Sequence, residues 1–231
     1  MGCVKVLDTG VLIGITIAQD QHHEECLNYV VDSDADAYAT PIVGQEFKDK
    51  LSEIRDILSR EIKKHRKTVI KNFGKNILNR TDIVQIREDI LNTDFNSHRF
   101  LFEFYEEIAQ QGEIERSQLA NLLSDMATEV YKDGAKEHGG FNSLVSGWSR
   151  SMDSYPDVEN ELLICEGDDP NVCIEAHHVA KTVNVDTELG TTNPKHFIEK
   201  QDGEPESRKE NILRVTSLVD VVDLSMGRYP M

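Results

Sequence analysis

The sequence predicts an α/β fold of three layers, with a central parallel sheet between helices and a mostly helical insertion. Apolar, β-branched segments alternate with helical patterns at both ends of the chain, and this alternation is typical of parallel sheets. Between them, residues 51–155 continue almost entirely at helical period without a strand pattern. Because 231 residues suffice for one well-cored domain with an insertion, we predict a discontinuous α/β domain over 1–50 and 156–231, interrupted by 51–155.

The N-terminal part predicts two strands and two helices. Residues 3–7 are short, apolar and β-branched, so we expect a buried strand that ends at the turn Asp8-Thr9-Gly10. A helix is expected from Val11, and a second helical pattern covers 21–31. Residues 37–40 are a candidate for the second strand.

A long helix is predicted after Pro41, because proline is favoured in the first turn of a helix. Apolar residues then recur every three or four positions, which places them on one helical face: Val43, Phe47, Leu51, Ile54, Leu58 and Ile62. The large apolar residues clustered between 95 and 105 predict an insertion core or an oligomer interface. Further helical segments are expected at 83–91, 95–108 and 119–131.

The C-terminal part, after Pro156, again alternates strand and helix patterns. A helix is expected over 171–183, and the polar, charged stretch 201–210 is expected to be an exposed loop. The strand candidates are 162–165, 189–191 and 212–216.

Composition excludes several classes of protein. Lys and Arg number 25 against 42 Asp and Glu, and the formal net charge of −17 argues against coating of duplex DNA by bulk electrostatics. The longest apolar runs are far shorter than the roughly 18 residues of a membrane span, so we expect no membrane association. Four scattered cysteines without a C-x-x-C pair predict free thiols in a reducing compartment, and hence a cytoplasmic protein.

Acidic residues lie close to the predicted strands, and open parallel sheets bind their ligands beyond the carboxyl ends of their strands. Asp8 follows the first strand, Glu46 lies on the helix after the second, and Asp169 opens a later helix. Asp186 or Asn193 flanks the penultimate strand. Converging carboxylates raise each other's pKa unless a cation neutralises them, and an all-oxygen cluster prefers Mg²⁺ or Mn²⁺. The pattern therefore predicts a divalent-metal site.

Four segments, in order, resemble the motifs of PIN-domain ribonucleases. Val6–Ile13 is similar to the opening motif, in which a strand runs into Asp-Thr-Asn or Asp-Thr-Gly and then an apolar helix. Thr40–Phe47 resembles the second motif, a Thr after the strand and a Glu six residues later. Asp169–Ala176 resembles the third motif, and Leu189–Phe197 resembles the fourth, Thr-x-Asn followed by a short helix with Phe. The resemblance covers the two ends of the chain and leaves the central part unmatched.

The resemblance implies a PIN-like fold and an endoribonuclease that hydrolyses RNA phosphodiester bonds with a divalent metal. One or two Mg²⁺ or Mn²⁺ ions would activate a water and stabilise the leaving oxygen. The implied catalytic residues are Asp8, Glu46, Asp169 and Asn193. The two aspartates would bind the metal directly, and the other two residues would complete its surroundings. Thr9 or Thr191 would orient a carboxylate or the phosphate.

The fourth motif departs from the family pattern, because Asn193 stands where an Asp is common. The longer segment before it contains Asp186, a candidate to replace the missing carboxylate, so the expected metal ligands are Asp8, Glu46, Asp169 and Asp186. Asp168 beside Asp169 leaves the third position open between the two. The alternative function is a catalytically weakened PIN-like scaffold that binds RNA or assembles with a partner.

RNA contact is predicted at the one strongly basic stretch, residues 60–75, which holds seven basic residues and one acidic residue. Its net charge is +6, and the rest of the chain therefore carries −23. The candidate RNA-binding residues are Lys63, Lys64, Arg66, Lys67 and Lys71. A solvated helix face, or contact with an acidic surface of a second copy, would use the same charges. A homodimer or another protein partner of the insertion therefore stays open.

Overall fold

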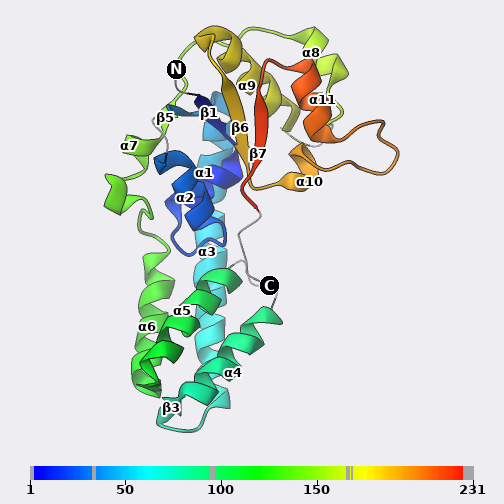
Figure 1. The fold of residues 1–231 in the computed structure, drawn as a ribbon. Coiled ribbons are helices and arrows are strands. Elements are labelled where there is room, and N and C mark those ends of the chain that lie inside the picture. Colours follow the sequence, from blue (N-terminus) through cyan, green and yellow to red (C-terminus); the bar gives the residue numbers. More distant parts are fainter. Residues whose placement is uncertain (1–2, 33–34, 94–96, 165–166, 168, 226–231) are drawn as a thin grey trace.

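The computed structural model describes residues 3–32, 35–93, 97–164, 167 and 169–225. Asp168 and the ends of two predicted segments, Phe95 and Cys165, lie outside these residues. The described chain forms two parts, a sheet flanked by helices and a limb of helices that extends from it (Figure 1).

A parallel sheet lies at the centre of the first part and confirms the predicted α/β fold class (Figure 1). Its order is β5-β2-β1-β6-β7, and every neighbouring pair is parallel. In the central pair, Val4 aligns with Thr187 and Leu7 with Gly190. The strands are β1 (Val4–Leu7), β2 (Ala37–Ala39), β5 (Ser146–Gly147), β6 (Thr187–Thr191) and β7 (Asp220–Asp223).

Helices flank this sheet. α1 packs against α2 and against the start of the long helix α3, while α9 packs against β1 and β6. All four residues of β1 are buried, as expected for a strand in the middle of a covered parallel sheet. The helices of this part are α1 (Thr9–Thr16), α2 (His23–Val31), α7 (Phe141–Leu144), α8 (Pro156–Glu161), α9 (Asp169–Val183), α10 (Pro194–Phe197) and α11 (Arg208–Val215), with the short 3₁₀ helix η1 (Lys136–His138).

The long helix α3 (Pro41–Asn72) joins the two parts, and it confirms the long helix predicted after Pro41. Its 32 residues extend over about 48 Å at about 1.5 Å per residue. It packs along α6 (Arg116–Glu129) in the limb, where α4 (Arg80–Leu91) packs along α5 (His98–Gln111). We call this limb, the C-terminal half of α3 with α4, α5 and α6, the helical insertion.

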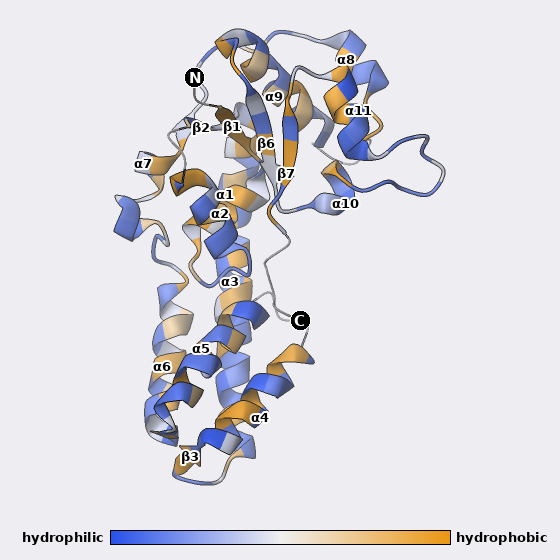
Figure 2. Ribbon diagram, viewed as in Figure 1, coloured by the Kyte–Doolittle hydropathy of each residue, from blue (hydrophilic) through white to orange (hydrophobic). Residues whose placement is uncertain are grey.

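Each part has its own hydrophobic core (Figure 2). The sheet core contains Leu7 and Leu12, and the insertion core contains Leu58 and Ile62 of α3 with Leu101 of α5, all of them fully buried. The apolar cluster predicted between residues 95 and 105 therefore contributes to the insertion core. At about 25 cal/mol per Å² of buried apolar surface, each such leucine contributes roughly 1.5–3 kcal/mol.

Two strand predictions are wrong. Residues 212–216 lie in or directly after α11, because Ser207 and Glu210 form a capping box that starts a helix. This helix also takes up the end of the loop predicted over 201–210, where Arg208 is buried. Residues 162–164 form no strand: the backbone N–H of Leu163 donates to the side chain of Asn211 instead of a neighbouring strand (2.9 Å). The terminal strand is β7.

The helical insertion also differs from its prediction at two places. β3 (Ile77–Asn79) and β4 (Glu113–Glu115) form a short antiparallel pair within it, too short to give a period in the sequence. β5 pairs with β2 in the main sheet, and the Trp148 N–H donates to the Ala39 carbonyl (2.9 Å). The predicted boundary at residue 155 is therefore too late.

In the described part of the chain, no helix is both long enough and apolar enough to cross a membrane.

Candidate functional site

A pocket of about 400 Å³ opens beyond the carboxyl ends of β1 and β6. It lies where α3 and α9 begin, which is where an open parallel sheet binds its ligands. We call it the acidic pocket, because three carboxylates line it. Its lining residues are Asp8, Thr9, Gly10, Ile13, Glu46, Lys50, Ile54, Gly167, Asp169, Thr192, Asn193 and His196.

Asp8 lies at the base of the acidic pocket, directly after β1, with 7% of its surface exposed. One carboxylate oxygen accepts a hydrogen bond from the Thr9 N–H (2.6 Å), and the other accepts one from the Thr191 hydroxyl (3.1 Å). Burial, with a smaller contribution from the charges of Asp169 and Glu46, raises the pKa of Asp8 to about 6, although the two hydrogen bonds lower it. The site therefore holds a carboxylate whose negative charge is only partly compensated.

Glu46 lies in the second turn of α3, on the face that points to the acidic pocket. Its carboxylate accepts hydrogen bonds from the Thr9 hydroxyl and from the Lys50 ammonium group one turn further along the helix. Burial raises the pKa of Glu46, but these two hydrogen bonds outweigh burial and the net shift is downward. Glu46 is thus ionised and paired.

Asp169 is the first residue of α9, and it faces the short helix α10 across the acidic pocket. The ring Nδ1 of His196 donates to its carboxylate (2.6 Å). Burial raises the pKa of Asp169, the hydrogen bond from His196 lowers it, and the charge of Glu46 raises it. Three acidic residues from distant parts of the chain therefore influence one another electrostatically in one pocket.

The segment after β6 completes the acidic pocket and fixes the carboxylate of Asp8. The backbone N–H of Asn193 donates to the Thr191 hydroxyl (3.0 Å), which itself donates to Asp8. Gly10 allows this close approach, because a Cβ atom at this position would lie 2.0 Å from the Thr192 hydroxyl oxygen, which would have to move. The Asp-Thr-Gly turn and the Thr-x-Asn segment thus fit against each other.

Six of the residues predicted for the site meet here, namely Asp8, Thr9, Glu46, Asp169, Thr191 and Asn193. Asp186 does not. It precedes β6, at the amino ends of the strands, where its carbonyl accepts from Val4 N–H (2.8 Å), whereas Asp8 follows the carboxyl end of β1. The expectation that Asp186 supplies the fourth carboxylate is wrong, because the strands run in parallel and separate the two residues.

The predicted RNA-binding residues lie on the part of α3 that belongs to the helical insertion, away from the acidic pocket. Lys63, Lys64, Lys67 and Lys71 have exposed side chains. Arg66 is half-buried, and its Nε donates to the Ala120 carbonyl of α6 (2.7 Å). Arg66 therefore ties two helices together and is not part of an exposed basic surface.

Two residues of the site, Lys50 and His196, are not among the predicted site residues, although the position of His196 after the fourth motif would allow it to approach a phosphate. Lys50 follows Glu46 by four residues, a spacing at which Glu and Lys meet on one helical face, so this contact could have been predicted. His196 follows Asn193 by three residues, but its contact with Asp169 depends on how α9 and α10 pack. The sequence carries no signal for that packing.

The donor set of the acidic pocket fits a hard divalent cation, because Asp8, Glu46, Asp169 and Asn193 offer only oxygen ligands from their side chains. Burial is the main cause of the raised pKa of Asp8 and of Asp169, and neighbouring carboxylates add to it, so a bound cation would stabilise their ionised forms. Within the described residues, no three His, Cys, Asp or Glu side chains already stand close enough together to hold a metal ion.

No protein-family model matches the chain, and comparison with curated proteins and with solved structures found no match.

Proposed function

We propose that the protein is an endoribonuclease that hydrolyses RNA phosphodiester bonds in the acidic pocket with Mg²⁺ or Mn²⁺. The observation that carries the proposal is the convergence of Asp8, Glu46 and Asp169 in one pocket at the carboxyl ends of the strands. These residues come from three separate parts of the sequence, and each belongs to one of the motifs that resemble PIN-domain ribonucleases. Solubility would be served by exposed carboxylates, whereas Asp8 is buried at a cost in free energy that raises its pKa to about 6.

Asp8 and Asp169 would hold the ion, with Glu46 and Asn193 at its margin. When bound, a divalent ion lowers the pKa of a water and neutralises the charge that develops on the phosphate. Thr191 holds the Asp8 carboxylate in one orientation, and Thr9 does the same for Glu46.

Lys50 and His196 add donors to the rim of the acidic pocket. Once their carboxylate partners turn to the ion, the Lys50 ammonium group and the His196 ring are placed to bind phosphate oxygens. Lys50 and His196 would thus position the substrate, and this role does not depend on a fourth acidic ligand.

A scaffold that binds RNA or assembles with a partner is the second candidate. The observation that favours it is the pairing of Glu46 with Lys50 and of Asp169 with His196, which partly neutralises the carboxylates without an ion. For either function we place the protein in the cytoplasm, since Cys26 and Cys173 are buried free thiols.

The test is cleavage of a mixture of structured and single-stranded RNA with Mn²⁺, with Mg²⁺ and with chelator. Asp8→Asn is compared with Asp186→Asn, the same chemical change at the opposite end of the sheet. We expect metal-dependent cleavage by the wild type and by Asp186→Asn, and at least about a hundredfold loss in Asp8→Asn. Intact RNA under every condition, with a folded protein, would reject the nuclease and favour the scaffold.

A further inference from the structure

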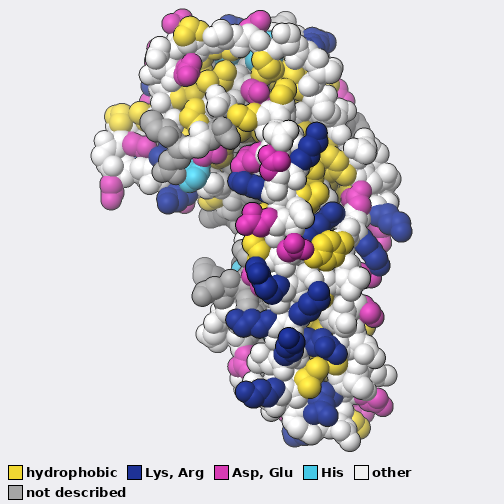
Figure 3. Space-filling view, turned by 180° about the vertical axis from the view of Figure 1, so that it is seen from behind, with side chains coloured by type: hydrophobic (Ala, Val, Ile, Leu, Met, Phe, Trp, Pro, Cys, Tyr) yellow, Lys and Arg dark blue, Asp and Glu magenta, His cyan; other side chains and the backbone are white. Residues whose placement is uncertain are grey.

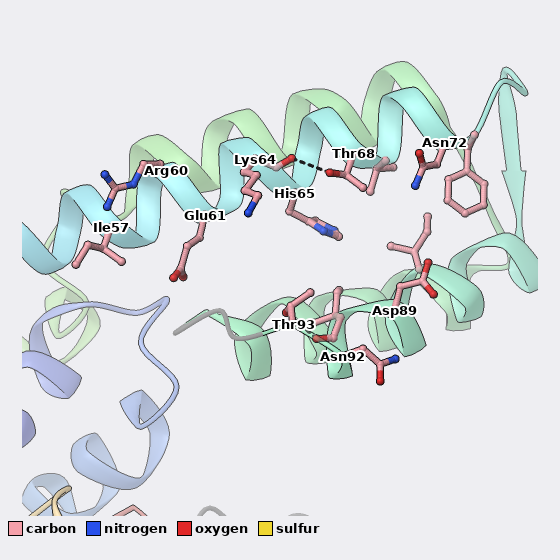
Figure 4. Close-up of a pocket in the computed structure, with 14 residues that line it drawn as sticks. Ile57, Arg60, Glu61, Lys64, His65, Thr68, Asn72, Asp89, Asn92 and Thr93 are labelled. Atoms are coloured by element: carbon pink, nitrogen blue, oxygen red, sulfur yellow. Dashed lines mark hydrogen bonds between the residues drawn. The ribbon is translucent and has the colours of Figure 1, made fainter.

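A pocket of about 680 Å³ lies in the helical insertion between α3 and α4 (Figure 4). We call it the insertion pocket. Its floor is apolar and consists of Val69, Phe73, Ile86 and Ile90, of which all but Phe73 are buried. Neither the acidic pocket nor the proposed hydrolysis uses this space.

The wall of the insertion pocket carries amide, hydroxyl and imidazole groups. Asn72, Asn92 and Thr68 line it, and Figure 4 shows Asn72 and His65 pointing from α3 toward α4. The His65 ring is hydrogen-bonded to the Tyr105 hydroxyl (3.0 Å), and burial lowers its pKa to about 4, so it is neutral near pH 7. An apolar floor with neutral hydrogen-bonding groups above it suits a flat heterocycle with polar edges, such as a nucleobase.

The positive charge that favours an anionic ligand lies around the insertion pocket, not in its lining. In the lining, Arg60 and Lys64 are balanced by Glu61, which accepts from the Ser97 N–H and hydroxyl (3.3 Å each), and by Asp89, which accepts from Gln85 (2.9 Å). The excess comes from the surrounding stretch of residues 60–75, which carries a net charge of +6. Figure 3 shows Lys and Arg side chains gathered over the insertion.

The rest of the protein strengthens this attraction. The chain carries a net charge of −17, while residues 60–75 carry +6. A polyanion is therefore repelled by most of the surface and drawn to this stretch of α3. A second lysine-lined hollow on the same stretch of α3, of about 510 Å³, includes Lys63, Lys67 and the half-exposed Tyr131 ring.

The insertion pocket and the acidic pocket open on the same face of α3. Glu46 of one and Lys64 of the other are five helical turns apart, which places them at the same angle around the helix and about 27 Å apart along it. Ile54 lines the acidic pocket and Ile57 lines the insertion pocket, so less than one turn separates the two linings. One extended ligand can lie along this face and enter both.

We propose that the insertion pocket binds one nucleotide of a single-stranded RNA whose backbone runs along α3 to the acidic pocket. The proposal rests on the proposed function for its substrate class. At about 3.4 Å per nucleotide in a fully stacked strand, the distance of about 27 Å between Glu46 and Lys64 corresponds to at most about eight nucleotides. The pocket thereby sets a minimum substrate length and a preferred distance between the bound nucleotide and the cleaved bond.

The test separates binding from cleavage. A fluorescently labelled single-stranded oligoribonucleotide of about twelve nucleotides, long enough to span both pockets, is bound to the Asp8→Asn protein and followed by anisotropy. Into this background Thr68→Trp fills the insertion pocket and Arg60→Glu reverses a charge at its rim. The matched controls are Thr128→Trp, an exposed helical threonine with the same hydrogen bond to the carbonyl four residues earlier, and Lys136→Glu.

We expect both pocket variants to weaken binding at least about tenfold, and both controls to leave it unchanged. In the cleaving protein, Thr68→Trp should slow cleavage of long oligonucleotides but not of those shorter than about eight nucleotides. Equal binding by pocket variants and controls would overturn the insertion pocket as an RNA site, even if the protein cleaves RNA. Selective loss of binding in a protein that never cleaves would support the RNA site and reject only the nuclease.

Discussion

The acidic pocket and the insertion pocket lie along one helix, but they arise from different kinds of structure. The acidic pocket is built from strand ends and helix starts, and its polar groups are held by short hydrogen bonds around one buried carboxylate, Asp8. The insertion pocket is a gap between α3 and α4 with an apolar floor and a basic rim. We propose that the first region holds a cation and that the second, within the basic stretch of α3, binds an anion.

The comparison indicates how a protein with an excess of acidic residues could bind RNA. Carboxylates that would hold metal repel phosphate until an ion is bound, so attraction has to come from another surface. α3 supplies that surface on its C-terminal half and carries Glu46 near its start. Substitutions in the acidic pocket and substitutions in the helical insertion should therefore give different defects.

The largest expected effect is loss of stability from matched truncations of the two cores. Leu12→Ala in α1 and Leu101→Ala in α5 each remove a fully buried leucine, and each should lower the free energy of unfolding by about 2–5 kcal/mol. Hydrogen exchange should accelerate most in the sheet part for the first variant and in the insertion for the second. Identical exchange patterns would show that the two cores unfold as one unit and would remove the basis for treating them separately.

The two regions should also respond to pH with opposite sign. Burial raises the pKa of Asp8 to about 6, so in metal-free protein its contribution to stability is present below about pH 4 and is lost as pH rises through about 6. Burial lowers the pKa of His65 to about 4, so its contribution is present above about pH 6.5 and is lost as pH falls through about 4. Each change amounts to at most about 3 kcal/mol.

Urea unfolding of the chelated protein from pH 4 to 8 measures this difference. Asp8→Asn should reduce the loss on the alkaline side, to which Asp20, whose pKa burial also raises to about 6, contributes as well. His65→Gln should reduce the loss on the acidic side, to which the buried His177 also contributes. If either variant kept the pH profile of the wild type, its residue would not be a buried titrating group of that region.

A smaller effect is expected from Gly10→Ala. A methyl group there would lie 2.0 Å from the Thr192 hydroxyl oxygen, and such overpacking should cost about 1–3 kcal/mol. Thr192→Ala removes that oxygen and should recover most of the loss in the double variant, a coupling that thermal unfolding of the four proteins would measure. Additive losses would mean that the turn and the segment after β6 do not press on each other.

The smallest expected effect concerns Lys50. Lys50→Gln removes the ammonium group that pairs with Glu46 and competes with a cation for it. Because half-exposed ion pairs contribute at most about 1 kcal/mol, Mn²⁺ affinity should rise by no more than about fivefold. Calorimetric titration with Mn²⁺ checks this, and weaker binding would assign Lys50 a supporting role in the metal site instead.

The sequence predicted those features that local pattern determines. The Asp-Thr-Gly turn, the long helix with its apolar face, Asp8 after a strand and Asp169 at the start of a helix could be inferred from order and spacing. The structure brings Asp8, Glu46 and Asp169 together, although the strand predicted before Asp169 does not form. The exclusion of Asp186 required the register between β1 and β6, because the residues flanking a strand look alike until its direction in the sheet is known.

Other features depended on packing that no local pattern carries. Residues 212–216 look like a strand by hydrophobicity, and only the capping box at Ser207 and Glu210 indicates the helix. The pairing of β2 with β5 involves two residues of each strand, too few to give a period. The insertion pocket exists because α4 lies apart from α3 along one side, and the helical period of each segment says nothing about that gap.

The central claim is that the acidic pocket holds a divalent ion, and Mn²⁺ binding measures it most directly. Mn²⁺ is titrated into the wild type, Asp8→Asn and Asp186→Asn, and free Mn²⁺ is followed by electron paramagnetic resonance. We predict saturable binding to the wild type and to Asp186→Asn, weakened at least about tenfold in Asp8→Asn. Equal binding by all three proteins, or no binding to any of them, would contradict the account.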